Sequence, residues 1–419
     1  MKERAVLQQE ARRTGPDSIV YVPGGGDQVD KHNMHLIVTP LPEGTFLATW
    51  TQATTPHGPD QRVVVARSFD RGQTWSRPQI IDQPEPDTER IASWSSLVVV
   101  PHSGWVYCLY HKNIGAVDYN RAMTGVLARR VSEDGGETWG ERFQTEIGRA
   151  AIDHPDARYP SNWVTAGWQL PIVTGRAQVL CPITRWSSRH HSQRPDFGDQ
   201  HHEAWFLRFE NILTETDPSR LAITTLPRGE HGIRVPHPVL EDSSAAMEPC
   251  IQSLADGRLL YLLRTMTGSL YYCLSKNCGE TWNMPEELCF TLGGPPILHP
   301  NAPCPLLRLR DGRFLLLFHN NDGTANGGTG PKDSKGRRPV WLSIGRELDN
   351  AGSQPIVFGR PRQLYDNGGP SRPHAGSLAL YGTLFEYAGT PYWWYADAMQ
   401  FLLGKRMPAE LLDDNWLPH

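Results

Sequence analysis

The sequence predicts an all-β fold built from repeated antiparallel units, and three observations support this prediction. The pattern S-x-D-x-G-x-T-W occurs at residues 68–75 and 132–139, and again at 275–282 with Asn in place of Asp. Each copy directly follows a short run of strand-forming residues. The 419 residues include 39 glycines and 35 prolines, a composition that suits many short strands joined by turns.

The repeated motif has a local structural explanation. Its Asp or Asn can accept backbone N–H bonds across a tight turn, its Gly can adopt a positive φ, and its Trp is expected to pack back onto its own hairpin. These roles belong to folding and not to catalysis. The motif resembles the Asp box, or bacterial neuraminidase (BNR) repeat. The resemblance implies a β-propeller of the sialidase type.

The strand-like runs group into six units of about four strands, which predicts a six-bladed ring. The ring forms one domain over residues 16–419, preceded by a charged, helical lead-in over 1–15. The isolated run at 18–23 is expected to complete the last blade, because closing the ring removes a bare sheet edge. A seventh blade, in 141–175 or 226–247, is the alternative. The six units begin near residues 36, 96, 177, 250, 305 and 377.

Composition restricts the partners. A formal net charge of −4 argues against nucleic acid or an anionic membrane as the main partner. No run of eighteen apolar residues predicts a transmembrane helix. The charged N-terminus lacks an apolar leader core, so we expect a cytoplasmic location, with secretion by a removed leader as the alternative. The seven cysteines have no paired spacing and predict free, mostly buried thiols. We expect no cofactor; the family resemblance allows a structural Ca²⁺, for which the sequence has no ligand signature.

The resemblance to sialidases also implies site residues. These enzymes hold a sugar carboxylate with three arginines, and they add an Asp acid/base on an early loop and a Tyr nucleophile polarised by a Glu. Glu248 and Arg264 bracket one inner strand pair and match the Glu and the second arginine. Arg338, in the segment 336–342, matches the third arginine, and Asp60 lies where the acid/base is expected. The structural alternative is an Arg–Glu pair between blades.

Two departures from the sialidase pattern stand out. The first inner strand is preceded by residues 32–38, HNMHLIV, where an Arg-Ile-Pro signature is expected, so His32 replaces the first arginine. In the last blade, the run 372–378 lacks the expected Tyr, and His374 is its nearest reactive side chain. The predicted mouth of the propeller instead gathers histidines, namely His32, His35, His111, His319 and His374.

Histidine titrates near neutral pH and can act as a general acid or base, which suits two chemistries. One is hydrolysis of a glycosidic bond. The other is β-elimination from a uronic acid, in which a base removes the C5 proton while Arg neutralises the carboxylate. Through the histidine before its first inner strand, the chain also resembles Asp-box propellers that cleave rhamnosyl-glucuronate linkages by His-dependent routes.

The sequence therefore predicts an enzyme that cleaves a glycosidic bond beside an acidic sugar of an oligosaccharide or glycan. The alternatives are an exo-α-sialidase and a non-catalytic propeller that binds glycan or protein. The predicted catalytic residues are His32, His35, Asp60, Glu248 and His374. The predicted substrate-binding residues are His111, Arg264, Asn301, His319, Arg338 and Arg372.

A long polar stretch, 186–200, belongs to no predicted strand. It contains His190 and His191 and is followed by His201 and His202. A metal site there lacks regular ligand spacing. We expect a loop that overhangs the mouth and sets the length of the substrate.

Overall fold

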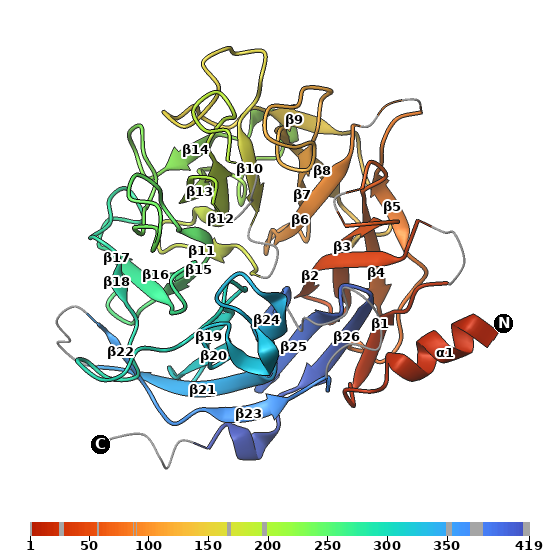
Figure 1. Cartoon of the computed structure of the whole chain (residues 1–419). Helices are drawn as coiled ribbons and strands as arrows, with labels where there is room; N and C mark the ends of the chain where they lie inside the picture. The colour runs from red at the N-terminus through yellow and green to blue at the C-terminus, as the bar shows by residue number, and fades with distance from the viewer. Residues whose placement is uncertain are drawn as a thin grey trace.

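The computed structural model has six antiparallel sheets arranged as blades around a central axis (Figure 1). The predicted six-bladed β-propeller is thereby confirmed. The structure describes residues 2–24, 29–56, 58–86, 88, 90–165, 169–194, 199–348, 354–368 and 380–413.

The first three blades each run from an inner to an outer strand. The first contains β2 (His32–Pro40), β3 (Phe46–Ala53), β4 (Arg62–Ser68) and β5 (Gln79–Asp82). The second contains β6 (Ala92–Val99), β7 (Val106–Lys112), β8 (Val126–Ser132) and β9 (Phe143–Thr145). The third contains β10 (Asn162–Thr165), β12 (Val179–Trp186), β13 (His202–Phe209) and β14 (Ile223–Leu226), with β11 (Ile172–Val173) beside β12. The interval 141–175 thus supplies strands to the second and third blades and not a seventh blade.

The remaining blades follow the same order. The fourth contains β15 (Met247–Ser253), β16 (Leu259–Arg264), β17 (Tyr271–Ser275) and β18 (Glu286–Glu287). The fifth contains β19 (Leu306–Arg308), β20 (Phe314–Phe318), β21 (Val340–Glu347) and β22 (Ile356–Phe358), with β23 (Arg362–Tyr365) beside β21. The sixth contains β24 (Gly382–Tyr387), β25 (Thr390–Asp397), β26 (Phe401–Arg406) and β1 (Ser18–Tyr21). The helical segments are α1 (Lys2–Glu10), η1 (Pro218–Arg220), η2 (Ala325–Gly327), η3 (Ser334–Gly336) and η4 (Ala409–Leu411).

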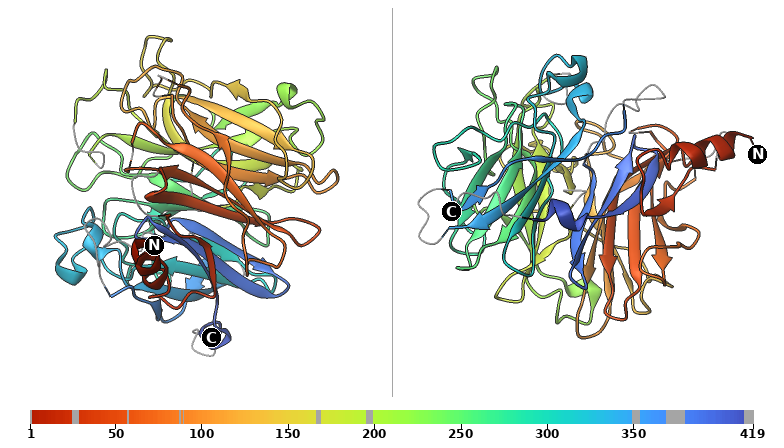
Figure 2. Two further views of the ribbon diagram at one scale, coloured as in Figure 1. Left: turned by 90° about the vertical axis from the view of Figure 1, so that its right-hand side faces the viewer. Right: turned by 90° about the horizontal axis from the view of Figure 1, so that it is seen from below.

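The N-terminal strand closes the ring. β1 pairs antiparallel with β26, with Ser18 opposite Gly404, and forms the outer strand of the last blade. This confirms the role predicted for the isolated run near residue 18. Helix α1 lies on the outside of the ring beside this blade (Figure 2). Leu7 of this helix and Ala11, which directly follows it, are buried in the core between the fifth and sixth blades.

The core is divided among the blades. One apolar cluster lies between each pair of neighbouring sheets, so both faces of most blades are covered. Large aromatic side chains fill these clusters, and Trp50, Trp163, Trp205 and Trp393 are almost completely buried. Because each cluster joins two sheets, burial of apolar area holds adjacent blades together and fixes the geometry of the central axis.

The three Asp boxes form the predicted turns. In the first, Asp70 Oδ1 accepts from the Thr74 backbone N–H at 2.8 Å, and Gly72 has a φ of +88°. Contrary to the prediction, the tryptophan does not pack only on its own hairpin. The Trp75 ring contacts Trp394 of the sixth blade edge-on, with 5.5 Å between centroids. The Asp box therefore also fastens one blade to the previous one.

All seven cysteines are free, and five of them are buried, as predicted. None of the helices in the described part of the chain is long and apolar enough to cross a membrane. Within the same residues, no group of three or more His, Cys, Asp or Glu side chains is placed to hold a metal ion.

Candidate active site

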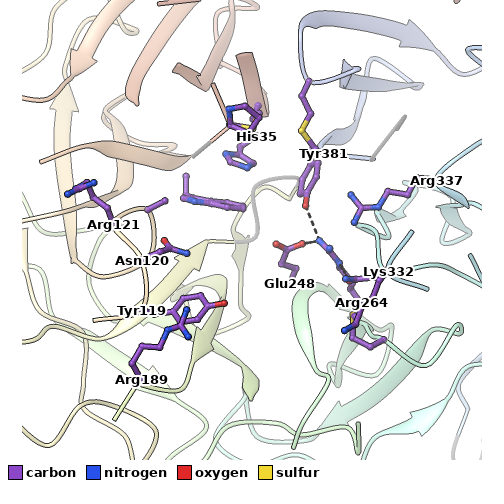
Figure 3. A pocket seen from close by; sticks show the side chains of 17 residues that line it. His35, Tyr119, Asn120, Arg121, Arg189, Glu248, Arg264, Lys332, Arg337 and Tyr381 are labelled. Atoms are coloured by element: carbon purple, nitrogen blue, oxygen red, sulfur yellow. Dashed lines mark hydrogen bonds and ion pairs between the residues drawn. The ribbon is translucent and has the colours of Figure 1, made fainter. Parts of the chain in front are cut away.

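A cavity of about 710 Å³ opens on the central axis and is lined by residues from all six blades. Its volume is within the range usual for sites that bind small molecules. Figure 3 shows the side chains converging on it from opposite sides. Loops that enter and leave the inner strands thus meet at one mouth, as a propeller requires.

Three inner strands contain irregularities that direct side chains into the cavity. The pairing register shifts in β2 at His35, in β6 at Trp94 and in β15 at Glu248. These residues have positive φ values of 60°, 54° and 41°. Such a conformation costs a non-glycine residue on the order of 1–3 kcal/mol and is found mostly at functional sites. All three side chains line the cavity.

Arg264, at the end of β16, is the centre of a buried polar network. Its Nη1 atom forms an ion pair with Glu248 and also donates to the Tyr381 hydroxyl at 3.0 Å. Its Nε atom donates to Asn301 Oδ1. Burial lowers the pKa of Arg264 to about 10, which still leaves the guanidinium charged at neutral pH. The network holds a cation at the wall of the cavity with part of its donor capacity unused.

Tyr381, directly before β24, lies between two arginines. Burial alone would raise the pKa of its hydroxyl, but the positive charges of Arg264 and Arg337 outweigh burial and lower this pKa below its usual value. The Arg337 guanidinium forms no ion pair with a carboxylate in the described part of the chain, and its buried Nε atom has no hydrogen-bond partner there. The two arginines thus activate the Tyr381 hydroxyl at the wall of the cavity.

His35 lies beside Tyr381. Its ring stacks on Trp94 with 3.6 Å between centroids and meets the Tyr381 ring nearly perpendicularly at 5.5 Å. Its Nδ1 atom is 3.3 Å from Thr51 Oγ1. The stack and the hydrogen bond fix the orientation of the imidazole at the cavity wall, beside the Tyr381 ring.

The charges that line the cavity are mostly positive. The described lining residues include one carboxylate, Glu248, which is neutralised by Arg264. They include five cationic side chains, those of Arg121, Arg189, Arg264, Lys332 and Arg337. An excess of cations in a concave site raises the local concentration of anionic ligands, so the cavity is suited to a negatively charged molecule.

Four of the predicted residues line the cavity, namely His35, Glu248, Arg264 and Asn301. Two others do not. His32 begins β2 opposite Ala53 and is not among the lining residues. Asp60 accepts from the Thr54 backbone N–H at 3.0 Å and so secures the loop between β3 and β4. Predicted residues Arg372 and His374 lie outside the described residues.

The choice between the adjacent arginines is corrected. Arg337 lines the cavity, whereas Arg338 donates two hydrogen bonds of 2.7 Å to Asp366 outside it. Arg337 ends the 3-10 turn η3 with φ −81° and ψ 36°, and Arg338 follows it, so the two side chains leave the backbone in different directions. The sequence motif places an arginine there but does not reveal which of the two faces the axis.

Two predicted histidines are buried in the blades instead of lining the mouth. His111 Nε2 is 2.8 Å from the Met123 carbonyl oxygen, and burial lowers its pKa to about 4. His319 Nδ1 is 3.0 Å from the Pro339 carbonyl oxygen, and its ring stacks on His299. Burial also lowers the pKa of His319. Both are neutral side chains that satisfy backbone groups.

Tyr381 directly precedes the inner strand of the last blade, and the sequence prediction did not name it. That prediction placed the start of the strand near residue 377, whereas the strand begins at Gly382. A tyrosine directly before an inner strand was the available signal. Trp94 and Tyr119 were also missed, and their sequence context offers no comparable signal because both depend on how loops fold over the axis.

Comparisons with known proteins agree with this fold. A family model described as BNR repeat-like domain matches residues 44–368. Similar solved structures include the Hadza microbial sialidase Hz136, with 14% identity and a TM-score of 0.62, covering 92% of this chain and 67% of that one. The intramolecular trans-sialidase from Ruminococcus gnavus has 14% identity and a TM-score of 0.62, and the match covers 95% of this chain and 98% of that one. The NanB sialidase from Streptococcus pneumoniae has 13% identity and a TM-score of 0.63, and the match covers 95% of this chain and 71% of that one. No curated protein sequence matches.

Proposed function

Since the chain belongs to the family of BNR repeat-like domains, we propose that it is a sialidase-like enzyme that cleaves the glycosidic bond of an acidic sugar. The observation that carries this proposal is the position of Tyr381, whose hydroxyl accepts from Arg264 in a cavity with an excess of cations. Sialidases, which the chain resembles, combine a tyrosine nucleophile with arginines that hold a sugar carboxylate.

The carboxylate of the sugar would bind between Arg264 and Arg337. The Nη2 atom of Arg264 has no hydrogen-bond partner among the described residues, and Arg337 has no carboxylate partner there. A guanidinium matches a carboxylate through two parallel N–H donors, and a buried cation gains most from such a partner. The sugar acid is thereby held against the Tyr381 hydroxyl.

Tyr381 would supply the nucleophilic oxygen. A carboxylate nucleophile would be repelled by the carboxylate of the substrate, whereas a phenol between two arginines is not. The lowered pKa of Tyr381 increases its nucleophilic phenolate fraction. The Tyr381 oxygen bonds to the anomeric carbon as the bond to the leaving oxygen breaks. A water molecule then displaces the tyrosine and releases the sugar acid.

His35 would transfer the protons. The leaving oxygen needs a proton in the first step, and the attacking water loses one in the second. Among the described residues that line the cavity, His35 is the only histidine. The only carboxylate among them, that of Glu248, is ion-paired with Arg264. An imidazole can both donate and accept near neutral pH, so His35 can serve in both steps.

The position of His35 also favours a second route, β-elimination from a uronic acid. His35 and Tyr381 share the cavity with both arginines, and their rings are 5.5 Å apart. In this route His35 removes the C5 proton, Arg337 neutralises the carboxylate, and Tyr381 protonates the leaving oxygen. The bond to the leaving group breaks and a conjugated, ultraviolet-absorbing product forms.

The test is an assay of aryl glycosides of sialic acid and of uronic acids, following both release of the aryl group and formation of an unsaturated product. We expect release of the sugar acid. Tyr381→Phe should lower kcat/KM roughly 10³-fold or more, because it removes the nucleophile. Tyr387→Phe, at the end of β24 and outside the lining of the cavity, is the matched control and should leave turnover unchanged.

The product formed by the wild type distinguishes the two routes, and His35→Asn tests the proton transfer by His35 that both routes need. Asn tolerates the positive φ of this position and removes the imidazole. If elimination operates, the wild type should give the ultraviolet-absorbing product from uronides and this variant should not. If hydrolysis operates, the wild type should release the sugar acid without that product, and this variant should lose the release. If the wild type binds acidic glycans but turns over none of these substrates, the proposed activity is wrong and the protein is a glycan-binding propeller.

A further inference from the structure

The cavity has a second cationic wall, opposite Tyr381. Tyr119, Asn120 and Arg121 come from the loop between β7 and β8, and Arg189 comes from the loop between β12 and β13. Figure 3 shows these residues on the side of the cavity that faces away from Arg264 and Arg337. The catalytic steps proposed above do not use this wall.

Arg189 is held in place by neutral groups. Its guanidinium lies over the Tyr119 ring, 4.6 Å from the centroid, and its Nη1 atom donates to the Arg194 carbonyl oxygen at 3.0 Å. No carboxylate pairs with this guanidinium in the part of the chain that the structure describes. Stacking and one hydrogen bond fix its position while leaving most of its five N–H donors unused. A cation fixed before binding loses little entropy when it takes up an anion.

Asp118 binds the backbone N–H of Arg189 and forms no ion pair with its guanidinium. Asp118 Oδ1 accepts from the Ser188 hydroxyl at 3.0 Å and from the Arg189 backbone N–H at 3.1 Å. Asp118 Oδ2 accepts from Asn162 Nδ2 at 2.7 Å. These contacts join the loops of the second and third blades and set Arg189 against Tyr119. The carboxylate therefore serves as a structural link, and the charge of Arg189 stays available.

Two guanidinium groups of the cavity thus lack a carboxylate partner among the described residues, Arg337 on one wall and Arg189 on the other. The other three lining cations do not enter this count, since Arg264 is paired with Glu248, Lys332 is paired with Asp199, and Arg121 takes part in an interaction of its own. A ligand with one anionic group would neutralise only one wall. A ligand that fills the cavity and neutralises both walls carries two anionic groups.

We propose that Arg189 forms a second anion-binding subsite, which takes a carboxylate or a sulfate or phosphate ester on the sugar unit next to the scissile bond. The preferred substrate is then an acidic glycan with charge on both units that flank the bond. The identity of the cleaved unit rests on the function proposed above, whereas the two-anion preference is a property of binding and is measured without turnover.

The test is isothermal titration calorimetry on the full chain carrying Tyr381→Phe, so that ligands stay intact. The ligands are a disaccharide of two sugar acids and a disaccharide of the same sugar acid linked to a neutral hexose. We expect the first to bind at least about tenfold more tightly. Adding Arg189→Gln should weaken binding of the two-acid ligand roughly 10- to 100-fold and leave the one-acid ligand unchanged, because only the former loses a charge-assisted contact.

Three controls make the result specific. Arg176→Gln removes the same charge from an exposed turn outside the cavity and should change neither affinity. Arg189→Lys keeps the charge but loses the planar fork, and should give an intermediate loss. A third ligand, with a sulfate ester on the neutral hexose, distinguishes a carboxylate subsite from a sulfate or phosphate subsite.

Equal affinities of the intact site for the one-acid ligand and both two-anion ligands would overturn the inference, as would equal losses for all ligands in Arg189→Gln. Intact preference without turnover in the wild type would contradict only the proposed activity.

Discussion

At the residue scale, two neighbouring arginines have different surroundings. Arg337 reaches the cavity and acts on the pKa of Tyr381, while Arg338 is bound by Asp366 through two hydrogen bonds. Both arginines belong to the same short segment, so they differ only in the direction in which their side chains point. The pair offers an internal comparison in which one substitution changes the site and the other does not.

Arg337→Gln should lower kcat/KM on an acidic glycoside roughly 10- to 100-fold, mainly through KM, because a charge-assisted contact to the sugar carboxylate is lost. The same substitution removes one of the two positive charges that lower the pKa of Tyr381. This pKa should therefore rise, and ultraviolet titration of the phenolate should show the rise. An unchanged KM together with an unchanged titration curve would contradict the assignment.

Arg338→Gln is the control. It removes the ion pair between Arg338, whose side chain is 17% exposed, and Asp366, whose side chain is 28% exposed. Because solvent screens such a pair, we expect the unfolding free energy to fall by about 1 kcal/mol or less. Steady-state kinetics of this variant should match the wild type.

At the scale of elements, short irregularities decide what the regular strands present to the axis. The bulges of β2, β6 and β15 turn His35, Trp94 and Glu248 into the cavity. A regular strand would send successive side chains to alternate faces of the blade, into the clusters between sheets. The Asp boxes act at the other end of the blades, where they fasten neighbouring sheets to one another.

Gly72 tests the fastening role of the first Asp box. It has a φ of +88°, and a Cβ atom there would overlap the Trp394 ring of the neighbouring blade. Gly257 has a similar φ of +84° but no atom within 4 Å of the added Cβ. Gly257→Ala should cost about 1 kcal/mol of unfolding free energy, from backbone strain alone. Gly72→Ala should cost at least about 1 kcal/mol more, because the packing of two blades is disturbed.

Urea unfolding of both variants measures the difference. Equal losses for the two glycines would show that the contact with Trp394 does not contribute to the stability of the ring.

At the scale of the whole molecule, the ring encloses neutral histidines. Burial lowers the pKa of His111 to about 4, of His202 to about 3 and of His299 to about 3, and it lowers the pKa of His319 as well. In the unfolded chain these side chains titrate near pH 6.5. Below that pH the unfolded state binds more protons than the folded state, so acid favours unfolding.

The unfolding free energy should therefore fall as pH decreases from about 6.5 toward 4, by on the order of 2 kcal/mol per buried histidine between pH 6.5 and 5. Urea unfolding at pH 7.5 and pH 5 measures this change. His111→Gln should reduce the difference between the two pH values, whereas His102→Gln, on the surface, should not. A stability that is constant over this range would contradict the burial of neutral histidines.

Much of the fold was predictable because its signals are local. Each Asp box contains its own turn, cap and packing residue within eight positions, and most strands are apolar runs bounded by turn residues. The closing strand β1 was also identified, because it lacks a neighbour in sequence. The prediction missed β10, the four-residue inner strand Asn162–Thr165 of the third blade, which no Asp box marks.

The site was only partly predictable. His35, Glu248, Arg264 and Asn301 were named from the sequence and line the cavity, because they lie in or beside strands whose ends meet at the mouth. Tyr381 and Arg337 were not, since each is one of several candidates in an irregular segment. Which candidate reaches the cavity depends on the directions of chains that lie far apart in sequence.

The sequence by itself therefore determined the repeat and the way the ring closes, and it favoured six blades over seven, because these follow from turns and strand periodicity that act over a few residues. Only the tertiary structure decided which lining cations have no carboxylate partner among the described residues, and that the Tyr381 hydroxyl lies between Arg264 and Arg337. Those properties depend on how the six blades pack together and on residues with strained backbone angles, whose conformational free energy is offset by contacts between blades. No single segment of the chain has these properties by itself.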